Sequence, residues 1–168
     1  NDASVAMAEH ISGNEETFAI YMNQMADSLG MNDTSYANST GLPNDDLYTT
    51  ARDISLLARA LIKNFPKEYK LYSQKEYVFN EIKQYSRNKL LYLDDSVDGI
   101  KTGFTKKAGY CLATSAKRGS RRLISVVLGA KSPDQRTKVS KSLLEYGFRF
   151  YETHKLFSSN QELTQTRV

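Results

Sequence analysis

The sequence has few of the residues that build disulfides and metal sites. It holds one cysteine, Cys111, which excludes an internal disulfide. The apolar neighbours of Cys111 indicate a small buried side chain rather than a reactive thiol. Neither His10 nor His154 has a partner at the spacing of a metal site, and we expect both to be surface or hydrogen-bonded histidines. The sequence therefore predicts no metal and no cofactor.

Long apolar runs and strong net charge are also absent. No apolar run is as long as the roughly 18 residues that a membrane span needs, so we expect no membrane-spanning segment. The net charge of +4 suits an anionic partner but is far from that of a dedicated nucleic-acid-binding protein. With 168 residues, of which 40% are hydrophobic and 25% charged, the chain is long enough for one globular domain with a real core.

Hydrophobic periodicity separates a helical region from a strand-rich region. Apolar residues at helical spacing predict helices over residues 2–12, 15–29, 51–64 and 133–152, with a further short helix at 66–72. Alternating or near-continuously apolar runs predict strands over residues 76–81, 82–87, 99–105, 109–117 and 122–130. The segment 31–48 carries turn residues, and a loop of this length usually has a function or acts as a lid.

Several side chains in these elements have expected structural roles. Asn14, Thr49 or Thr50, and Ser132 are expected to cap helices, and Asp53 is interpreted as a capping acid. A basic cluster at residues 117–122 is interpreted as a solvated strand edge. The apolar stripe of the second helix is expected to be core, and it consists of Phe18, Tyr21, Met22, Met25 and Leu29.

The tripeptide Lys101-Thr102-Gly103 is the motif in the sequence that points most directly to a chemical function. A lysine places a cation beside an anionic ligand or a nucleophile, and a threonine hydroxyl can donate to a carboxylate. A glycine lets a substrate lie against the backbone as an added strand. Lys-Thr-Gly is one of the motifs of penicillin-binding proteins and serine β-lactamases. Three residues alone are a weak signal, and in isolation a surface turn after a short strand is the simpler interpretation.

The surroundings of the tripeptide extend this likeness over nearly the whole chain. The sequence resembles the D-alanyl-D-alanine carboxypeptidases, the low-molecular-mass penicillin-binding proteins of the penicillin-binding protein five type. The matching stretches are residues 1–8, 51–53, 97–105, 107–110, 122–125 and 146–150. The resemblance implies an α+β or α/β fold of the β-lactamase and transpeptidase type, with an antiparallel sheet flanked by helices and incomplete at its N-terminus.

The resemblance also implies a reaction and its partners. A serine of such an enzyme attacks the carbonyl between the two terminal D-alanines of a peptidoglycan pentapeptide, and water then releases the shortened peptide from the acyl-enzyme. β-Lactam antibiotics resemble that dipeptide and are expected as ligands. The implied location is periplasmic, on the outer face of the cytoplasmic membrane, with contact to the membrane only through a C-terminal anchor that this chain does not contain. No nucleic acid partner is implied.

The resemblance also implies roles for individual residues of this sequence, according to the positions that match the family's motifs. The resemblance implies that Lys101 supports proton transfer and, with Thr102, Gly103 and Arg136, binds the substrate and its carboxylate. The backbone N–H of Phe104 is expected to donate to the oxyanion, and the family often has a histidine at this position. Asn1 is interpreted as the last residue of the Ser-x-Asn motif, which contacts the substrate amide.

The sequence departs from the family pattern at its start. It begins at Asn1 without an initiator methionine, and we expect the Ser-x-x-Lys nucleophile and its lysine to lie in a preceding segment. The chain alone is then expected to be inactive and to associate through an exposed sheet edge. Residues 1–153 are interpreted as part of the catalytic domain, and residues 154–168 as the start of a truncated β-rich domain.

Two other functions are compatible with the residues. One is a serine β-lactamase or esterase of the same fold, which fast turnover of nitrocefin would distinguish. The other is a non-catalytic basic module that binds cell-wall or nucleic-acid polymers, whose affinity would fall steeply with salt.

Overall fold

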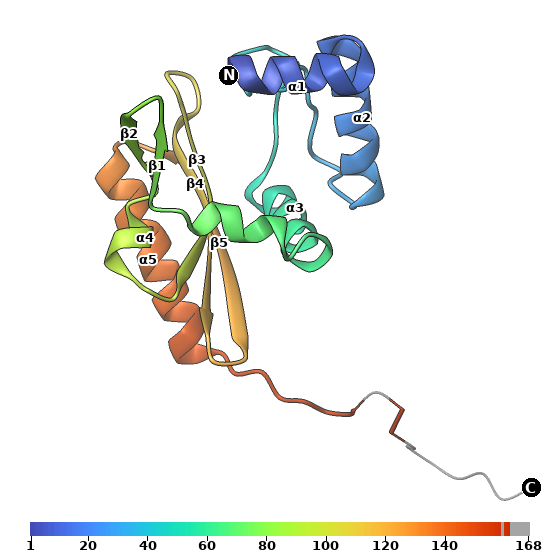
Figure 1. Cartoon of the computed structure of the whole chain (residues 1–168). Helices are drawn as coiled ribbons and strands as arrows, with labels where there is room; N and C mark the ends of the chain where they lie inside the picture. The colour runs from blue at the N-terminus through green and yellow to red at the C-terminus, as the bar shows by residue number, and fades with distance from the viewer. Residues whose placement is uncertain (159, 162–168) are drawn as a thin grey trace, which may run out of the picture.

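The computed structural model describes residues 1–158 and 160–161 (Figure 1). Its first half is helical, with α1 (Asp2–Ser12), α2 (Glu15–Ser28), α3 (Ala51–Asn64) and the 3-10 helix η1 (Glu68–Ser73). A small hairpin of β1 (Glu76–Phe79) and β2 (Ile82–Tyr85) and a single turn of helix, α4 (Leu90–Leu93), lead into the second half. That half consists of β3 (Val97–Thr105), β4 (Gly109–Arg118), β5 (Arg121–Ala130) and α5 (Pro133–Phe150).

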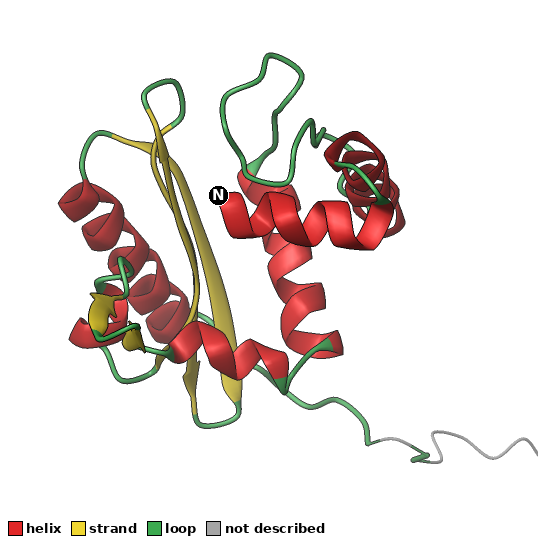
Figure 2. Ribbon diagram, turned by 45° about the horizontal axis from the view of Figure 1, so that its top comes forward, coloured by secondary structure: helices red, strands yellow, loops and turns green. Residues whose placement is uncertain are grey.

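The three long strands form an antiparallel sheet in the order β3-β4-β5. Figure 2 shows α5 on one face of this sheet and η1 and α3 on the other. The register sets Lys101 opposite Ala113 and Gly103 opposite Cys111. The structure therefore confirms the predicted antiparallel sheet flanked by helices, and it places β3 at an edge of the described sheet.

The main core lies between the sheet, α4 and α5. Strand alternation sends every second side chain of β4 toward α5, where apolar residues repeat at helical spacing. The buried members of this cluster are Leu90, Leu91, Val97, Leu112, Ala116, Leu144 and Phe148. This packing fixes the sheet against α5, and so fixes the strand that carries the Lys-Thr-Gly motif relative to the helix that carries Arg136.

Helices α1, α2, α3 and α5 begin where the sequence predicts, whereas the short helix predicted at 66–72 is the 3-10 helix η1, which begins at Glu68. The side chain of Asn14 accepts a hydrogen bond from the backbone N–H of Thr17 (2.7 Å), and Ser132 accepts one from Gln135 (3.1 Å). Thr50, not Thr49, caps α3. Each cap satisfies an N–H group that the first helical turn cannot pair internally.

The predicted role of Asp53 is wrong. Its carboxylate is 2% exposed and accepts hydrogen bonds from the Asp33 N–H (2.9 Å) and the Thr34 hydroxyl (2.7 Å). It thereby ties the loop of residues 31–50 to α3 instead of capping the helix. Spacing along the sequence favoured the cap because it carries no information on which loop returns to the helix.

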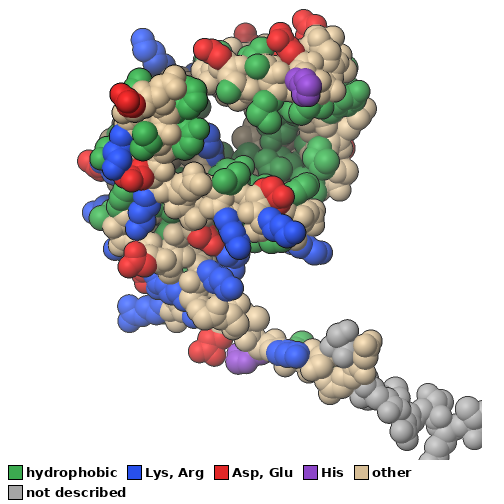
Figure 3. All heavy atoms as spheres, viewed as in Figure 1, with side chains coloured by type: hydrophobic (Ala, Val, Ile, Leu, Met, Phe, Trp, Pro, Cys, Tyr) green, Lys and Arg blue, Asp and Glu red, His purple; other side chains and the backbone are tan. Residues whose placement is uncertain are grey.

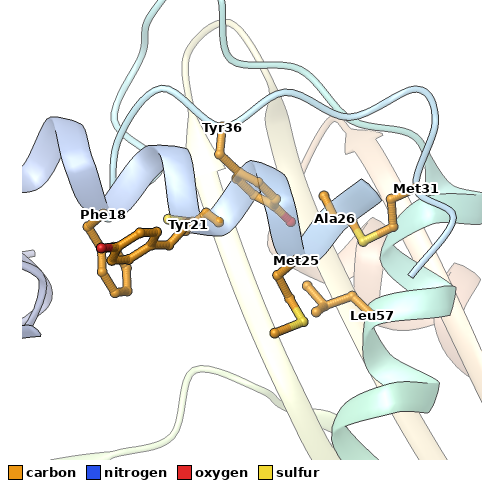
Figure 4. Close-up of a pocket in the computed structure, with 8 residues that line it drawn as sticks. Phe18, Tyr21, Met25, Ala26, Met31, Tyr36 and Leu57 are labelled. Atoms are coloured by element: carbon orange, nitrogen blue, oxygen red, sulfur yellow. The ribbon is translucent and has the colours of Figure 1, made fainter. Parts of the chain in front are cut away.

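The apolar stripe of α2 is more exposed than the sequence predicts. Tyr21 and Met25 are 47% and 56% exposed, so the expectation that they are core is wrong. With Phe18, Met31 and Leu57 among its other lining residues, they border an apolar cavity of about 300 Å³ between α2 and α3 (Figure 4). Helical spacing identified the apolar face but not whether another element covers it.

The basic cluster at residues 117–122 also differs from its expected role as a solvated edge. Arg118 pairs with both Asp94 and Glu145, and Arg122 pairs with Asp98 at 2.6 Å. These arginines hold the hairpin to its surroundings, which charge patterning alone did not indicate.

The end of the chain has little regular structure where it is described. Residues 151–158 and 160–161 follow α5 without a helix or strand. The predicted start of a second domain at residues 154–168 lies partly outside the described residues and stays a prediction. No described helix has the length and apolar character needed to cross a membrane.

Candidate active site

The Lys-Thr-Gly motif lies in the middle of the edge strand β3. Because side chains alternate along a strand, Lys101 and Gly103 share one face and Thr102 and Phe104 the other. Within the described residues no strand pairs with the outer edge of β3. An edge strand that contains a glycine can add an extended peptide by main-chain hydrogen bonds.

Lys101 is exposed, but its ammonium group folds back onto the strand. Its Nζ donates to the carbonyl oxygen of Thr102 at 2.6 Å. Partial burial of the ammonium, and then the positive charges of Arg87 and Arg136, lower the pKa of Lys101. A lysine whose pKa is lowered exchanges its proton more readily near neutral pH, which suits a group that relays protons.

Arg136 reaches the same strand from the first turn of α5. Its guanidinium donates to the carbonyl oxygens of Gly103 (3.2 Å), Cys111 (3.4 Å) and Arg87 (3.4 Å). The residue is 7% exposed, and its Nε has no hydrogen-bond partner among the described residues. The structure thus brings together Lys101, Gly103 and Arg136, which the sequence could connect only through the resemblance.

Arg87 is a member of this group that the sequence analysis missed. Its charge helps to lower the pKa of both Lys101 and Arg136, so the three cations lie near one another. In the described part of the chain none of them forms an ion pair with a carboxylate. Three neighbouring cations without a counter-ion create a positive potential that attracts an anionic ligand. The turn before α4 brings Arg87 close to Lys101 and Arg136, and no pattern in the sequence indicated this placement.

Asn1 immediately precedes α1, at the end of that helix that faces the sheet. Figures 1 and 2 both show this end near the top of the three-stranded sheet, and the space-filling view is hollowed between them (Figure 3). The side chain of Asn1 makes no capping hydrogen bond, while its carbonyl oxygen accepts from the Ser4 N–H at 2.8 Å. Its predicted contact with a substrate amide stays a prediction.

Phe104 contributes an exposed ring next to the motif. The ring stacks on that of Tyr110 with centroids 4.2 Å apart, and the Arg136 guanidinium lies 5.7 Å from the Tyr110 centroid. Cys111, predicted to be buried, is only half-buried. A phenyl ring cannot take or give a proton, so the side chain of Phe104 is not suited to the proton transfer that a histidine at this position could perform.

A polar cluster holds the start of β3, three residues before Lys101. Asp98 accepts hydrogen bonds from Arg122 (2.8 Å), Ser115 (2.5 Å) and Tyr69 (3.2 Å). Burial raises the pKa of Tyr69 to about 12, so its hydroxyl stays neutral and can donate. Gly99 is required beside it, because a Cβ there would lie 2.7 Å from the Tyr69 hydroxyl. The cluster therefore sets the path of the strand into the motif.

Replacing Asp98 by alanine should lower the free energy of unfolding of the full-length protein by about 2 kcal/mol near neutral pH. The Asp98–Arg122 pair is partly buried, so its loss should cost more than a surface pair (about 0–1 kcal/mol) and less than a fully buried pair (about 3–5 kcal/mol). Urea unfolding measures this. Glu76→Ala, which breaks the more exposed pair with Lys83, should cost less than about 1 kcal/mol.

The contribution of Asp98 should also depend on pH. Burial raises the pKa of Asp98, but hydrogen bonds from Arg122 and Ser115 outweigh burial and leave the pKa below its ordinary value. The stabilisation is therefore present above the unfolded pKa of about 3.9 and is lost as pH falls below it. The difference between wild type and Asp98→Ala should shrink toward about pH 3. A difference that grows on acidification would contradict this.

One literal Ser-x-x-Lys, Ser86 to Lys89, escaped the sequence analysis. The Nζ of Lys89 is paired with Asp134 at 2.7 Å. The Oγ of Ser86 accepts from the backbone N–H of Asn88 (3.3 Å) in the turn before α4. With its lysine engaged elsewhere, Ser86 lacks the adjacent base that activates a serine nucleophile.

Comparison with known proteins connects this geometry to a family. A match to the family described as D-alanyl-D-alanine carboxypeptidase covers residues 1–132. The chain is 47% identical over 154 residues to D-alanyl-D-alanine carboxypeptidase DacC of Escherichia coli (strain K12), which is 91% of this chain and 38% of that protein. The chain thus spans about two fifths of the length of this relative.

Solved structures agree with the sequence comparison. Penicillin binding protein 5 from Haemophilus influenzae superposes with a TM-score of 0.85 at 45% identity, over 88% of this chain and 44% of that one. The ampicillin-bound form of penicillin-binding protein D2 from Listeria monocytogenes superposes with a TM-score of 0.82 at 35% identity, over 89% of this chain and 62% of that one.

Proposed function

The chain belongs to the D-alanyl-D-alanine carboxypeptidase family, and from this membership we propose that the full-length protein removes the terminal D-alanine from peptidoglycan peptides. The single observation in the structure that best supports this is the group of three cations beside an open strand edge. A peptide that ends in a free carboxylate fits such a group, because its main chain can pair with β3 while its carboxylate meets positive charge.

The proposed reaction is acyl transfer to a serine. The serine hydroxyl attacks the carbonyl carbon of the penultimate D-alanine and loses its proton, the C–N bond to the terminal D-alanine breaks, and the leaving amine is protonated. Water then hydrolyses the ester and regenerates the serine. The nucleophile is proposed to lie in a segment before Asn1, next to its own lysine.

Each site residue of this chain has a proposed task. Lys101 supports proton transfer at the serine, and Thr102 donates its hydroxyl to the substrate carboxylate. Gly103 leaves room for the peptide, and the N–H of Phe104 donates to the oxyanion. Arg136 supplies a buried positive charge for the carboxylate. Asn1 is proposed to contact the substrate amide.

β-Lactams are proposed as ligands of the same site. The Listeria monocytogenes relative is described in an ampicillin-bound form, and the chain matches its fold over most of the described residues. Peptidoglycan lies outside the cytoplasmic membrane, so we propose a periplasmic location for the reaction. Self-association of the chain through its exposed sheet edge is a further proposal, which size-exclusion chromatography can test.

Labelling by a fluorescent penicillin tests the proposed function. The full-length protein should be labelled covalently and should release D-alanine from a D-Ala-D-Ala peptide. The 168-residue chain alone should remain unlabelled. Labelling of that chain would mean that a serine within it is the nucleophile. Fast nitrocefin turnover by the full-length protein would instead favour a β-lactamase, and salt-sensitive polyanion binding without labelling would favour a basic binding module.

A further inference from the structure

An aromatic pair and a hollow lie beside the proposed carboxylate site. We define the aromatic shelf as Phe104 and Tyr110. We propose that this shelf and the hollow form a subsite for a flat apolar side chain on the substrate residue that carries the free carboxylate. The inference rests on the proposed function and names its substrate class: peptides that end in an aromatic D-residue as well as those that end in D-alanine.

The shelf is a surface on which a further ring can stack. Phe104 is 56% exposed although its ring packs on Tyr110 at 4.2 Å with an angle of 26° between the planes. An exposed, already oriented aromatic face gains contact area when an apolar group covers it, and offset stacking adds to the gain. Because Tyr110 supports the ring from one side, a ligand would meet the opposite or edge side of Phe104.

The shelf is within reach of a side chain whose carboxylate is held at Arg136. The guanidinium carbon lies 5.7 Å from the centre of the Tyr110 ring. A carboxylate hydrogen-bonded to this group would lie about 2.8 Å from its nitrogens. The side chain of a terminal residue leaves from the carbon next to its carboxylate, so it emerges close to the shelf. The methyl group of D-alanine is too short to cover the rings, whereas a benzyl group can.

The hollow beyond the shelf has room for such a group. It has a volume of about 520 Å³ and lies between the β3–β4 turn and the end of β5. Gly109 and Gly129 contribute no side chains to its lining, and a Cβ at Gly109 would lie 3.0 Å from the carbonyl oxygen of Ala130. Pockets for small ligands span about 300–1,000 Å³, so a single aromatic side chain fits with space for water.

The charges around the hollow narrow the class of side chain further. Lys106, Lys107 and Lys131 line it, and Lys107 is paired with Asp45 at 2.9 Å. A cationic side chain that enters the hollow would meet like charge, which discriminates against it. We therefore expect a terminal D-Phe to be accepted and a terminal D-Lys to be rejected.

Cleavage of three peptides by the full-length protein tests the proposed subsite. The substrates are diacetyl-L-Lys-D-Ala-D-Xaa with D-Ala, D-Phe or D-Lys at the end, and the readout is kcat/KM from the released D-amino acid. The D-Phe peptide should be cleaved at least tenfold faster than the D-Lys peptide. In Phe104→Ala the ratio of D-Phe to D-Ala should fall about tenfold, because one apolar contact surface is lost. Phe104→Tyr, which keeps a ring, should retain the ratio.

A loss of the oxyanion contact made by the Phe104 backbone affects both substrates and cancels in the ratio of kcat/KM for D-Phe to that for D-Ala. A change in this ratio therefore reports on the aromatic shelf. Tyr77→Ala removes an exposed ring on the β1–β2 hairpin and should leave the ratio unchanged. A D-Phe to D-Ala ratio that falls less than threefold in Phe104→Ala would overturn the subsite while leaving the carboxypeptidase function in place. If the wild type cleaves none of the peptides, both proposals fail.

Discussion

Replacing Lys101 by alanine should slow the acylation of the full-length protein by a fluorescent penicillin by about a hundredfold or more. A side chain that moves a proton in the transition state contributes about a hundredfold to ten-thousandfold to a rate. Lys101 is suited to this because burial and two neighbouring arginines lower its pKa while its Nζ is held at the Thr102 carbonyl. The second-order rate constant of labelling measures the loss.

Two further variants separate proton transfer from charge alone. Lys101→Arg keeps the positive charge but cannot give up a proton at neutral pH, so it should not restore the rate. Lys117→Ala removes an exposed lysine from β4 and should label at the wild-type rate. Full recovery in Lys101→Arg would assign Lys101 a purely electrostatic task, and wild-type labelling of Lys101→Ala would remove it from the mechanism.

Replacing Arg136 by alanine should raise KM for a D-Ala-D-Ala peptide about a hundredfold, with a smaller change in kcat. Removing one partner of a buried charge pair costs about 2–5 kcal/mol, which corresponds to about thirtyfold to several-thousandfold and includes the expected factor. KM carries most of the effect because the carboxylate is bound in both the ground state and the transition state. Steady-state kinetics of D-alanine release measure both parameters.

The substrate itself supplies the control for Arg136. A peptide whose terminal carboxylate is replaced by an amide should be cleaved poorly by the wild type, and Arg136→Ala should then have little further effect. Arg149→Ala, at the exposed end of the same helix, should leave KM unchanged. Equal losses on the acid and the amide would mean that Arg136 acts by holding the backbone of β3 rather than by binding the carboxylate.

The elements of the fold could largely be predicted from the sequence, because local patterns determine them. Caps such as Asn14 and Ser132 and the alternation of β3 to β5 are properties of a few neighbouring residues. The side chains that were misjudged depend on contacts between distant segments. The carboxylate of Asp53 binds the loop at residues 31–50 instead of capping α3, and the residues next to Asp53 in the sequence do not indicate that this loop returns to the helix.

The site was only partly predictable, because some of its residues meet only through contacts between segments that are distant in the sequence. Lys101, Thr102 and Gly103 are adjacent in sequence, so their chemistry could be recognised as a motif. Arg136 reaches Gly103 only when α5 packs on the sheet, and the resemblance alone pointed to it. Arg87 lies near Lys101 and Arg136 because of a turn that no sequence pattern indicated.

A crystal structure of the full-length protein acylated by ampicillin tests most directly whether β3 is the wall of a carboxylate-binding cleft. We predict that the ligand lies along β3, with its carboxylate within hydrogen-bond distance of the Thr102 hydroxyl and on the side of Lys101 and Arg136. An acylated serine whose ligand carboxylate points away from all three residues would contradict this.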